Sequence, residues 1–190
     1  VLTRRISSAA SDVYERRGRH RTCAVLYTGA GNCWGDNFHG ELGNNSPTSG
    51  SVPVAVATFT DGATAVSITA GSYHTCAVLN TGAVNCWGYN FDGQLGNNTT
   101  INSSAPVAVA AFTDGATAVS ITAGGSLTCA VLNTGAVNCW GYNSNGQLGN
   151  GNTDNSLVPV AVSAFTVGSA TAGSITAGAV HPLSLRTISE

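Results

Sequence analysis

The chain has 190 residues, of which 43% are hydrophobic and only 8% charged, with a formal net charge of −2 at pH 7. Disordered chains show the opposite balance, and no apolar run approaches the roughly 18 residues of a membrane span. Every basic residue is an arginine, and none lies between Thr22 and Leu185, where all the charged side chains are acidic. Such a surface repels phosphate groups, so we expect no nucleic-acid binding.

The first 21 residues form a segment unlike the rest of the chain, and they hold six of the seven arginines. Val13–Gly18 occupies the place that Val66–Gly71 takes in the pattern described below. Two explanations are open: a reading-frame shift in the gene, or a genuine basic segment outside the folded domain. We predict an irregular or anomalous segment over residues 1–21.

Residues 22–181 contain a tandem repeat with a period of 53 residues. Ala77–Asn90 is identical to Ala130–Asn143. Equivalent cysteines, tryptophans, glycines, prolines and phenylalanines recur at the same step, for example Trp34, Trp87 and Trp140. Repeats of this length indicate stacked supersecondary units that share one continuous core.

Within one unit we predict four short strands, at about Val66–Ala70, Thr75–Leu79, Ala83–Gly88 and Val107–Ala110. Each segment is short, β-branched or apolar, and bounded by turn-forming residues. Four strands in about 50 residues is the format of a propeller blade. We therefore predict an all-β fold, a partial β-propeller of about three four-stranded blades, in preference to other β folds built from repeats.

The central hairpin of each unit places two cysteines opposite each other. In Leu79-Asn80-Thr81-Gly82-Ala83 a three-residue loop ends in glycine, which suits the left-handed position at a bulge. Centring the hairpin on Thr81 pairs Cys76 with Cys86, and the same construction gives two more pairs, Cys23–Cys33 and Cys129–Cys139. The prediction is three disulfides; the alternatives are buried free thiols and, against the usual ligand spacing, zinc.

If these disulfides form, the compartment is oxidising, which means extracellular, cell-surface or periplasmic. The chain-entropy model gives roughly 3 kcal/mol of stabilisation for each bridge.

Three loops rich in asparagine and glycine follow the central hairpins: Asp36–Gly40, Tyr89–Gly93 and Tyr142–Gly146. They lack the regular acidic ladder of a calcium loop, so turn formation explains them better. Their aromatic residues are the candidates for a partner-binding surface, with packing between blades as the alternative: Phe38, Tyr89, Phe91 and Tyr142.

No pattern in the sequence forms an active site. Nucleophile-elbow, phosphate-loop and metal-helix motifs are absent, and the four histidines have no ligand spacing. Asp61 and Asp114 are repeat-equivalent and precede glycine, so they belong to a turn. We expect no enzyme activity, no cofactor and no metal.

The repeat begins a fourth time and then stops. Ser174–Gly178 matches the start of a unit, and His181 stands where His74 does, but Pro182–Arg186 replaces the expected second strand. We predict an anomalous tail over residues 182–190. Open blade edges favour association with other chains, so self-association is expected to be possible.

The string Trp87-Gly88-Tyr89-Asn90-Phe91-Asp92-Gly93-Gln94-Leu95-Gly96, with the segment Ala70–Leu79 before it, resembles the regulator of chromosome condensation repeat, especially its cysteine-containing bacterial version. The resemblance covers roughly residues 22–181. It implies a fragment of a seven-bladed propeller. Members of that family include an exchange factor for a small GTPase, secreted β-lactamase inhibitors and bacterial surface proteins.

Two positions depart from the pattern. The His74 position is Arg21 in the first unit and Leu127 in the third, and the Gln94 position is Glu41 in the first. We interpret His74 as making a hydrogen bond between blades and Gln94 as making a turn bond. The functional prediction is an exported, non-enzymatic module that binds a protein partner. A structural or adhesive surface scaffold is the first alternative, and a nucleotide exchange factor is the second.

Overall fold

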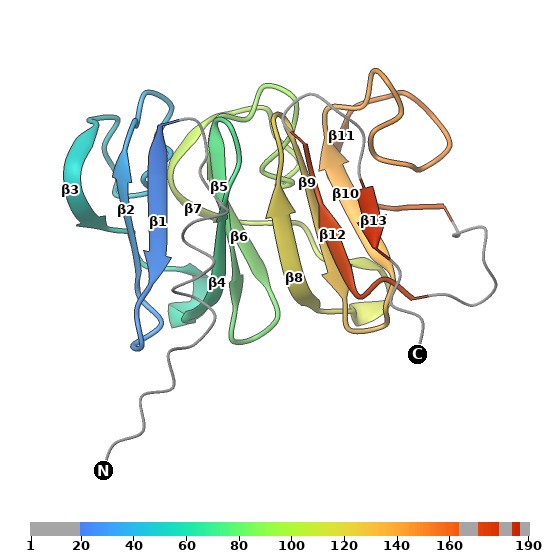
Figure 1. Cartoon of the computed structure of the whole chain (residues 1–190), viewed down its shortest axis with the longest axis horizontal. Helices are drawn as coiled ribbons and strands as arrows, with labels where there is room; N and C mark the ends of the chain where they lie inside the picture. The colour runs from blue at the N-terminus through green and yellow to red at the C-terminus, as the bar shows by residue number, and fades with distance from the viewer. Residues whose placement is uncertain (1–19, 164–170, 179–183, 187–190) are drawn as a thin grey trace, which may run out of the picture.

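The structure is a computed structural model that describes residues 20–163, 171–178 and 184–186. Over these residues the chain consists of β-strands joined by loops and two short 3₁₀ turns, at Thr60–Gly62 and Thr113–Gly115. Its antiparallel sheets follow one another along the long axis of the molecule (Figure 1). No helix within these ranges is long and apolar enough to cross a membrane.

The strands form one sheet per repeat, in simple chain order. The first described sheet has three strands, β1 (Arg21–Val25), β2 (Gly31–Gly35) and β3 (Gly50–Ala55). The second has four strands, β4 (Ala65–Ala70), β5 (His74–Leu79), β6 (Val84–Gly88) and β7 (Ser103–Ala108). The third has β8 (Ala118–Ala123), β9 (Leu127–Leu132), β10 (Val137–Gly141) and β11 (Ser156–Ala161). The predicted all-β partial propeller is confirmed.

The fourth strand of the unit differs from its predicted position. We expected it at Val107–Ala110, but β7 begins at Ser103 and ends at Ala108. The strand starts early because a bulge between Cys86 and Gly88 lets Gly88 pair with Ser103 while Cys86 pairs with Val107. Pro106 is tolerated inside β7 because this strand is the outer edge of its sheet.

The central hairpins have the predicted register. Val78 pairs with Val84 and Cys76 with Cys86, and Gly82 has a φ of +78°. The corresponding cysteines of the first and third sheets also face each other. All six cysteines form disulfides, Cys23–Cys33, Cys76–Cys86 and Cys129–Cys139, with Cα–Cα distances of 4.1, 4.0 and 4.1 Å.

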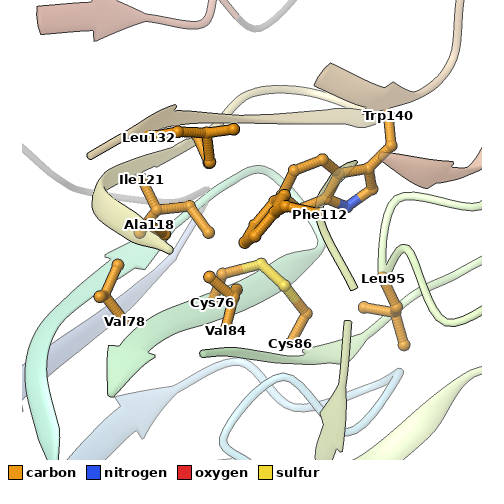
Figure 2. Close-up of a cluster of buried hydrophobic side chains, with 11 residues drawn as sticks. Cys76, Val78, Val84, Cys86, Leu95, Phe112, Ala118, Ile121, Leu132 and Trp140 are labelled. Carbon is orange, nitrogen blue, oxygen red and sulfur yellow. A yellow bond between two sulfur atoms is a disulfide. The ribbon is translucent and has the colours of Figure 1, made fainter. Parts of the chain in front are cut away.

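The hydrophobic core lies between successive blades. Figure 2 shows the core between the second and third blades, where the Cys76–Cys86 disulfide lies close to Phe112 and Trp140. The core between the first and second blades repeats this arrangement with Cys23, Cys33, Leu42, Phe59 and Trp87. At both of these interfaces the earlier blade contributes its disulfide and the later blade its tryptophan, whereas the disulfide of the third blade packs against Ala172 and Ile175.

The described part of the fourth unit holds two short strands. β12 (Ser174–Thr176) pairs with β13 (Ser184–Arg186), and Ile175 lies opposite Leu185. The tail sequence thus supplies a second strand even though it lacks the repeat's own residues. His181, and the anomalous N-terminal segment up to position 19, lie outside the described residues.

The strands end at two rims of different character (Figure 1). We call the rim with the long loops between third and fourth strands the loop rim. It comprises residues 36–49, 89–102 and 142–155, together with the turns at 71–73 and 124–126. The opposite rim carries the central hairpin turns at 26–30, 80–83 and 133–136 and the two 3₁₀ turns, and we call it the hairpin rim.

Candidate partner-binding rim

Each long loop of the loop rim is organised around one buried asparagine. The Oδ1 atom of Asn90 accepts the N–H of Leu95 at 2.9 Å, and its Nδ2 donates to the carbonyl oxygens of Thr99 and Ile101 at 2.9 and 3.1 Å. Asn37 and Asn143 have the same role in the other units. These loops are therefore held by side-chain amides. Among the described residues, no three His, Cys, Asp or Glu side chains gather as a metal site.

Gln94, four residues after Asn90, closes the loop and links it to the next blade. Oε1 of Gln94 accepts the N–H of Asp92 at 3.1 Å, which is the predicted turn bond. Its carbonyl oxygen accepts hydrogen bonds from Trp140 Nε1 at 2.9 Å and Thr128 Oγ1 at 2.8 Å. Glu41 makes the same bonds one blade earlier. These bonds link each loop of the rim to the following blade.

Arg21 crosses the boundary between the first two blades. Its buried guanidinium donates to Thr75 Oγ1 at 3.1 Å, to the carbonyl oxygens of Ser72 and Gly71 at 3.0 Å, and to that of His74. Burial lowers the pKa of Arg21 to about 10, although nearby carboxylates raise it. The side chain stays charged at neutral pH and is fully used in holding two blades together.

His74 crosses the next boundary, as predicted. Its Nε2 lies 2.8 Å from Oγ1 of Thr128, whose own hydroxyl proton goes to the carbonyl oxygen of Gln94. Nε2 therefore carries the ring proton, and Nδ1 is buried without a partner. Burial, and then the charge of Arg21, lower the pKa of His74 to about 3. The imidazole is neutral at physiological pH.

The aromatic side chains predicted to bind a partner lie on the loop rim with unequal exposure. Phe38 is 83% and Phe91 68% exposed. Tyr89 is half-buried, with its ring centroid 5.2 Å from that of Phe91. Tyr142 is also half-buried, one blade further on, where Ser144 takes the place of Phe91. The structure thus brings Tyr89 and Phe91 together but leaves Tyr142 in a different neighbourhood.

Two further residues join this group and were not singled out from the sequence. The ring of His39 lies 4.9 Å from that of Tyr89 and 6.0 Å from that of Tyr73, both in edge-to-face geometry. Tyr73 in turn lies 6.0 Å from Tyr89. His39, Tyr73, Tyr89 and Phe91 therefore form one connected group, which we call the aromatic cluster. Its members come from the first and second repeats.

A signal for Tyr73 exists in the differences between the second and third units. Nearly all substitutions between residues 54–106 and 107–159 fall on the loop rim or on strand ends beside it. The loop-rim residues that change are Ser72, Tyr73, Phe91, Asp92, Asn98, Thr99 and Ile101, which become Gly125, Ser126, Ser144, Asn145, Gly151, Asn152 and Asp154. In the adjoining strands His74, Ser104 and Ala105 become Leu127, Leu157 and Val158, and away from this rim Thr58 becomes Ala111.

The hairpin rim provides the comparison. Its turns are also exposed, at Asn80 and Thr81 in the second unit and at Asn133 and Thr134 in the third. The two hairpin turns are nevertheless identical in sequence. Exposure alone therefore does not explain why the loop rim varies. The two units therefore differ mainly on and beside the loop rim, while the hairpin rim stays constant.

The acidic residues of the hairpin rim belong to turns. Asp61 and Asp114 lie inside the 3₁₀ turns with φ of 56° and 59°, in the left-handed region that aspartate tolerates. Between the second and third blades a cavity of about 360 Å³ opens on this rim, lined by Asp61 and otherwise by small or apolar residues and threonines such as Leu79, Phe112 and Thr117. Neither feature assembles a nucleophile with a base.

Comparison with known proteins agrees with the repeat structure. Models of the regulator of chromosome condensation (RCC1) repeat match residues 33–78, 81–131 and 134–183, and a second such model matches 65–94 and 118–147. The chain is 33% identical over 108 residues to the mitochondrial RCC1 domain-containing protein RUG3 of Arabidopsis thaliana, covering 57% of this chain and 24% of that protein. It is 35% identical over 128 residues to the ultraviolet-B receptor UVR8 of the same plant, covering 67% and 29%.

Solved structures show the same fold at lower identity. Human WBSCR16 superposes with a TM-score of 0.72 at 21% identity, covering 90% of this chain and 42% of that one. Prp20p from Saccharomyces cerevisiae gives a TM-score of 0.74 at 19% identity, covering 85% and 40%. This chain thus spans less than half of each of these proteins. With its repeat, its blades and these matches in agreement, the chain belongs to the regulator of chromosome condensation (RCC1) repeat family.

Proposed function

We propose that this chain is a non-enzymatic protein-binding module, and that the loop rim of its first two blades is the contact surface. The observation that carries the proposal is the exposed aromatic cluster, with Phe38 beside it, on the rim where otherwise similar repeats differ. Large aromatic side chains on a rigid platform are typical anchors of protein interfaces, because they bury much area at little cost in conformational entropy.

We further propose that the protein works in an oxidising compartment outside the cytoplasm. Three disulfides in 190 residues support this, because reduced compartments rarely keep such bridges. Thiol titration of the protein purified from its source under alkylating conditions tests it. Titratable thiols only after reduction agree with export, whereas six thiols without reductant contradict it.

The binding proposal is tested with matched variants of the two rims. Phe38→Ala and Phe91→Ala remove exposed anchors of the loop rim, and Tyr27→Ala removes a 93% exposed ring from the hairpin rim. Each protein is used to capture partners from the exported fraction of the source cells. We expect one stoichiometric partner that Tyr27→Ala retains and the loop-rim variants lose. Equal retention by all variants contradicts the assignment of the rim.

An adhesive or structural scaffold is the alternative favoured by one observation, the identity of Ala77–Asn90 and Ala130–Asn143. A scaffold needs uniform blades and no stoichiometric partner, so failure to capture any protein supports it. The third function is nucleotide exchange on a small GTPase. Prp20p, which binds Gsp1p and histones, shares the fold at 19% identity. Accelerated nucleotide release from a GTPase by this chain favours exchange.

A further inference from the structure

The aromatic cluster presents ring faces as well as ring edges. His39 meets Tyr73 and Tyr89 at interplanar angles of 86° and 61°, so the rings stand edge to face rather than stacked on each other. Phe91 is tilted by 46° from Tyr89 and is 68% exposed. The electron-rich faces of these rings are therefore not all used within the molecule, and a ring face attracts a cation.

The loops that carry the cluster also carry carboxylates, and the part of the chain that the structure describes places no exposed lysine or arginine beside them. Asp36 lies in the loop of Phe38 and His39, and Asp92 directly follows Phe91. The carboxylate of Asp92 accepts one exposed, long hydrogen bond of 3.4 Å, from Asn155. Among the described residues Arg21 interacts with the charge of Asp36, but its guanidinium is buried and committed to backbone oxygens. No lysine or arginine lies between Thr22 and Leu185.

We propose that the aromatic cluster receives the guanidinium of an arginine on the partner protein, stacked against the rings, while Asp36 and Asp92 supply the opposing charge. This inference rests on the proposed function, because it takes the partner to be a protein. Arginine fits better than lysine, since its planar and weakly hydrated group stacks on aromatic faces and pairs with carboxylates. An apolar anchor alone would leave the negative charge of these loops without a role.

The third unit shows what the blade looks like without this site. Tyr73, Phe91 and Asp92 correspond there to Ser126, Ser144 and Asn145. The blade keeps its loop geometry with these residues, because Asn143 makes the same buried bonds as Asn90. Tyr73→Ser, Phe91→Ser and Asp92→Asn therefore remove rings or charge from the cluster while using residues that the same fold already accommodates.

The test uses two synthetic peptides of identical sequence, one with arginine and one with the uncharged isostere citrulline, titrated into the full chain. Aromatic NMR signals report binding at the cluster. We expect the arginine peptide to shift the signals of Tyr89 and Phe91, and the citrulline peptide to bind at least about fivefold more weakly. Each of the three variants should raise the Kd for the arginine peptide about three- to tenfold, and Tyr27→Ser on the hairpin rim should leave it unchanged.

Several outcomes overturn the proposal. These are equal affinity for the two peptides, no shift of the cluster signals at saturating peptide, or preferential binding of a neutral oligosaccharide to the same rings. The proposed function fails separately. If Phe91→Ala loses the captured partner while the arginine peptide does not bind the cluster, the loop rim is an interface but the guanidinium site is wrong. If the loop-rim variants keep the partner, the protein-binding rim itself is wrong.

Discussion

His74 illustrates how one side chain makes an interface between blades sensitive to acid. It is fully buried, bonded through Nε2 to Thr128, and has no partner for Nδ1. A proton added to Nδ1 would create a buried positive charge that has no hydrogen-bond acceptor. The positive charge of Arg21 would disfavour it further. The folded state therefore excludes the proton that the unfolded chain accepts.

The stability of the protein should consequently fall as the pH drops below the ordinary pKa of histidine. The pKa of His74 is about 3 when folded and 6.5 in the unfolded reference, so its contribution is complete above pH 6.5 and is lost as the pH falls toward 3. Relative to His74→Leu, the wild type should lose about 2 kcal/mol between about pH 7.5 and about pH 5.

Urea unfolding of both proteins at the two pH values measures this difference. Leucine is the matched replacement because Leu127 holds the equivalent position in the third blade. Parallel loss of stability in wild type and variant would show that His74 takes up its proton in the folded state.

Contacts within one repeat could be predicted from its sequence pattern, whereas between repeats only the hydrogen bond of His74 to the next blade was anticipated, from the family resemblance. The Cys76–Cys86 pair and the turn bond of Gln94 lie within one unit and follow from its sequence pattern. His39 and Tyr73 were missed because they meet across a blade boundary, from different strand connections of different repeats. Periodicity within one unit carries no information about which rings become neighbours between units.

At the scale of the structural element, the long loops of the first two blades come so close to the tryptophan of the next blade that only glycine fits at the point of contact. A Cβ on Gly96 would lie 2.7 Å from Nε1 of Trp140, and Gly96 has a φ of +67°. Gly115 has nearly the same φ, +68°, but open space around the position of a Cβ. Substitution of Gly115 therefore measures the cost of the left-handed backbone alone, and substitution of Gly96 adds the cost of overpacking.

We expect Gly115→Ala to lower the free energy of unfolding by about 1 kcal/mol, through backbone strain alone. Gly96→Ala should lower it by a further 1 to 3 kcal/mol, about the usual cost of overpacking a core, because the indole must move and its bond to the carbonyl of Gln94 is strained. Chemical denaturation of the two variants measures both values. Equal losses would mean that the loop yields freely and that the contact between Trp140 and this loop does not fix the blade boundary.

The disulfide in each central hairpin should stabilise the fold mainly by restricting the unfolded chain. Cys76 and Cys86 are ten residues apart in sequence and fully buried. The double variant Cys76→Ala/Cys86→Ala should lower the free energy of unfolding by about 3 kcal/mol under oxidising conditions. Alanine is chosen because a buried serine hydroxyl would lack a partner. Unchanged stability of the double variant would show that this bridge contributes nothing beyond the hairpin.

The strands themselves could be predicted to within a few residues, with one instructive exception. The first three strands of a unit have regular pairing and clear turn signals, and they lie where the pattern places them. The fourth strand is displaced because a bulge changes the pairing register between Cys86 and Gly88. The alternation of side chains along one strand does not reveal where its pairing with the neighbouring strand shifts.

For the whole molecule, the faces between blades determine whether the 190-residue chain stays monomeric by itself. Trp87 and Trp140 are fully buried against the preceding blade, whereas Trp34 of the first described sheet is only half-buried. We expect concentration-dependent association of the isolated chain, measured by light scattering, and Trp34→Gln should weaken it. A monomer at all concentrations would contradict this expectation.

The central claim is that the loop rim of the first two blades is where a partner binds. Hydroxyl-radical footprinting tests it most directly, because the oxidation rate of an aromatic side chain falls when a partner shields it from solvent. With the captured partner bound, oxidation of Phe38 and Phe91 should fall strongly, while that of Tyr27 on the hairpin rim should not change. Protection of Tyr27 with continued oxidation of Phe38 and Phe91 would place the interface on the opposite rim and contradict the account.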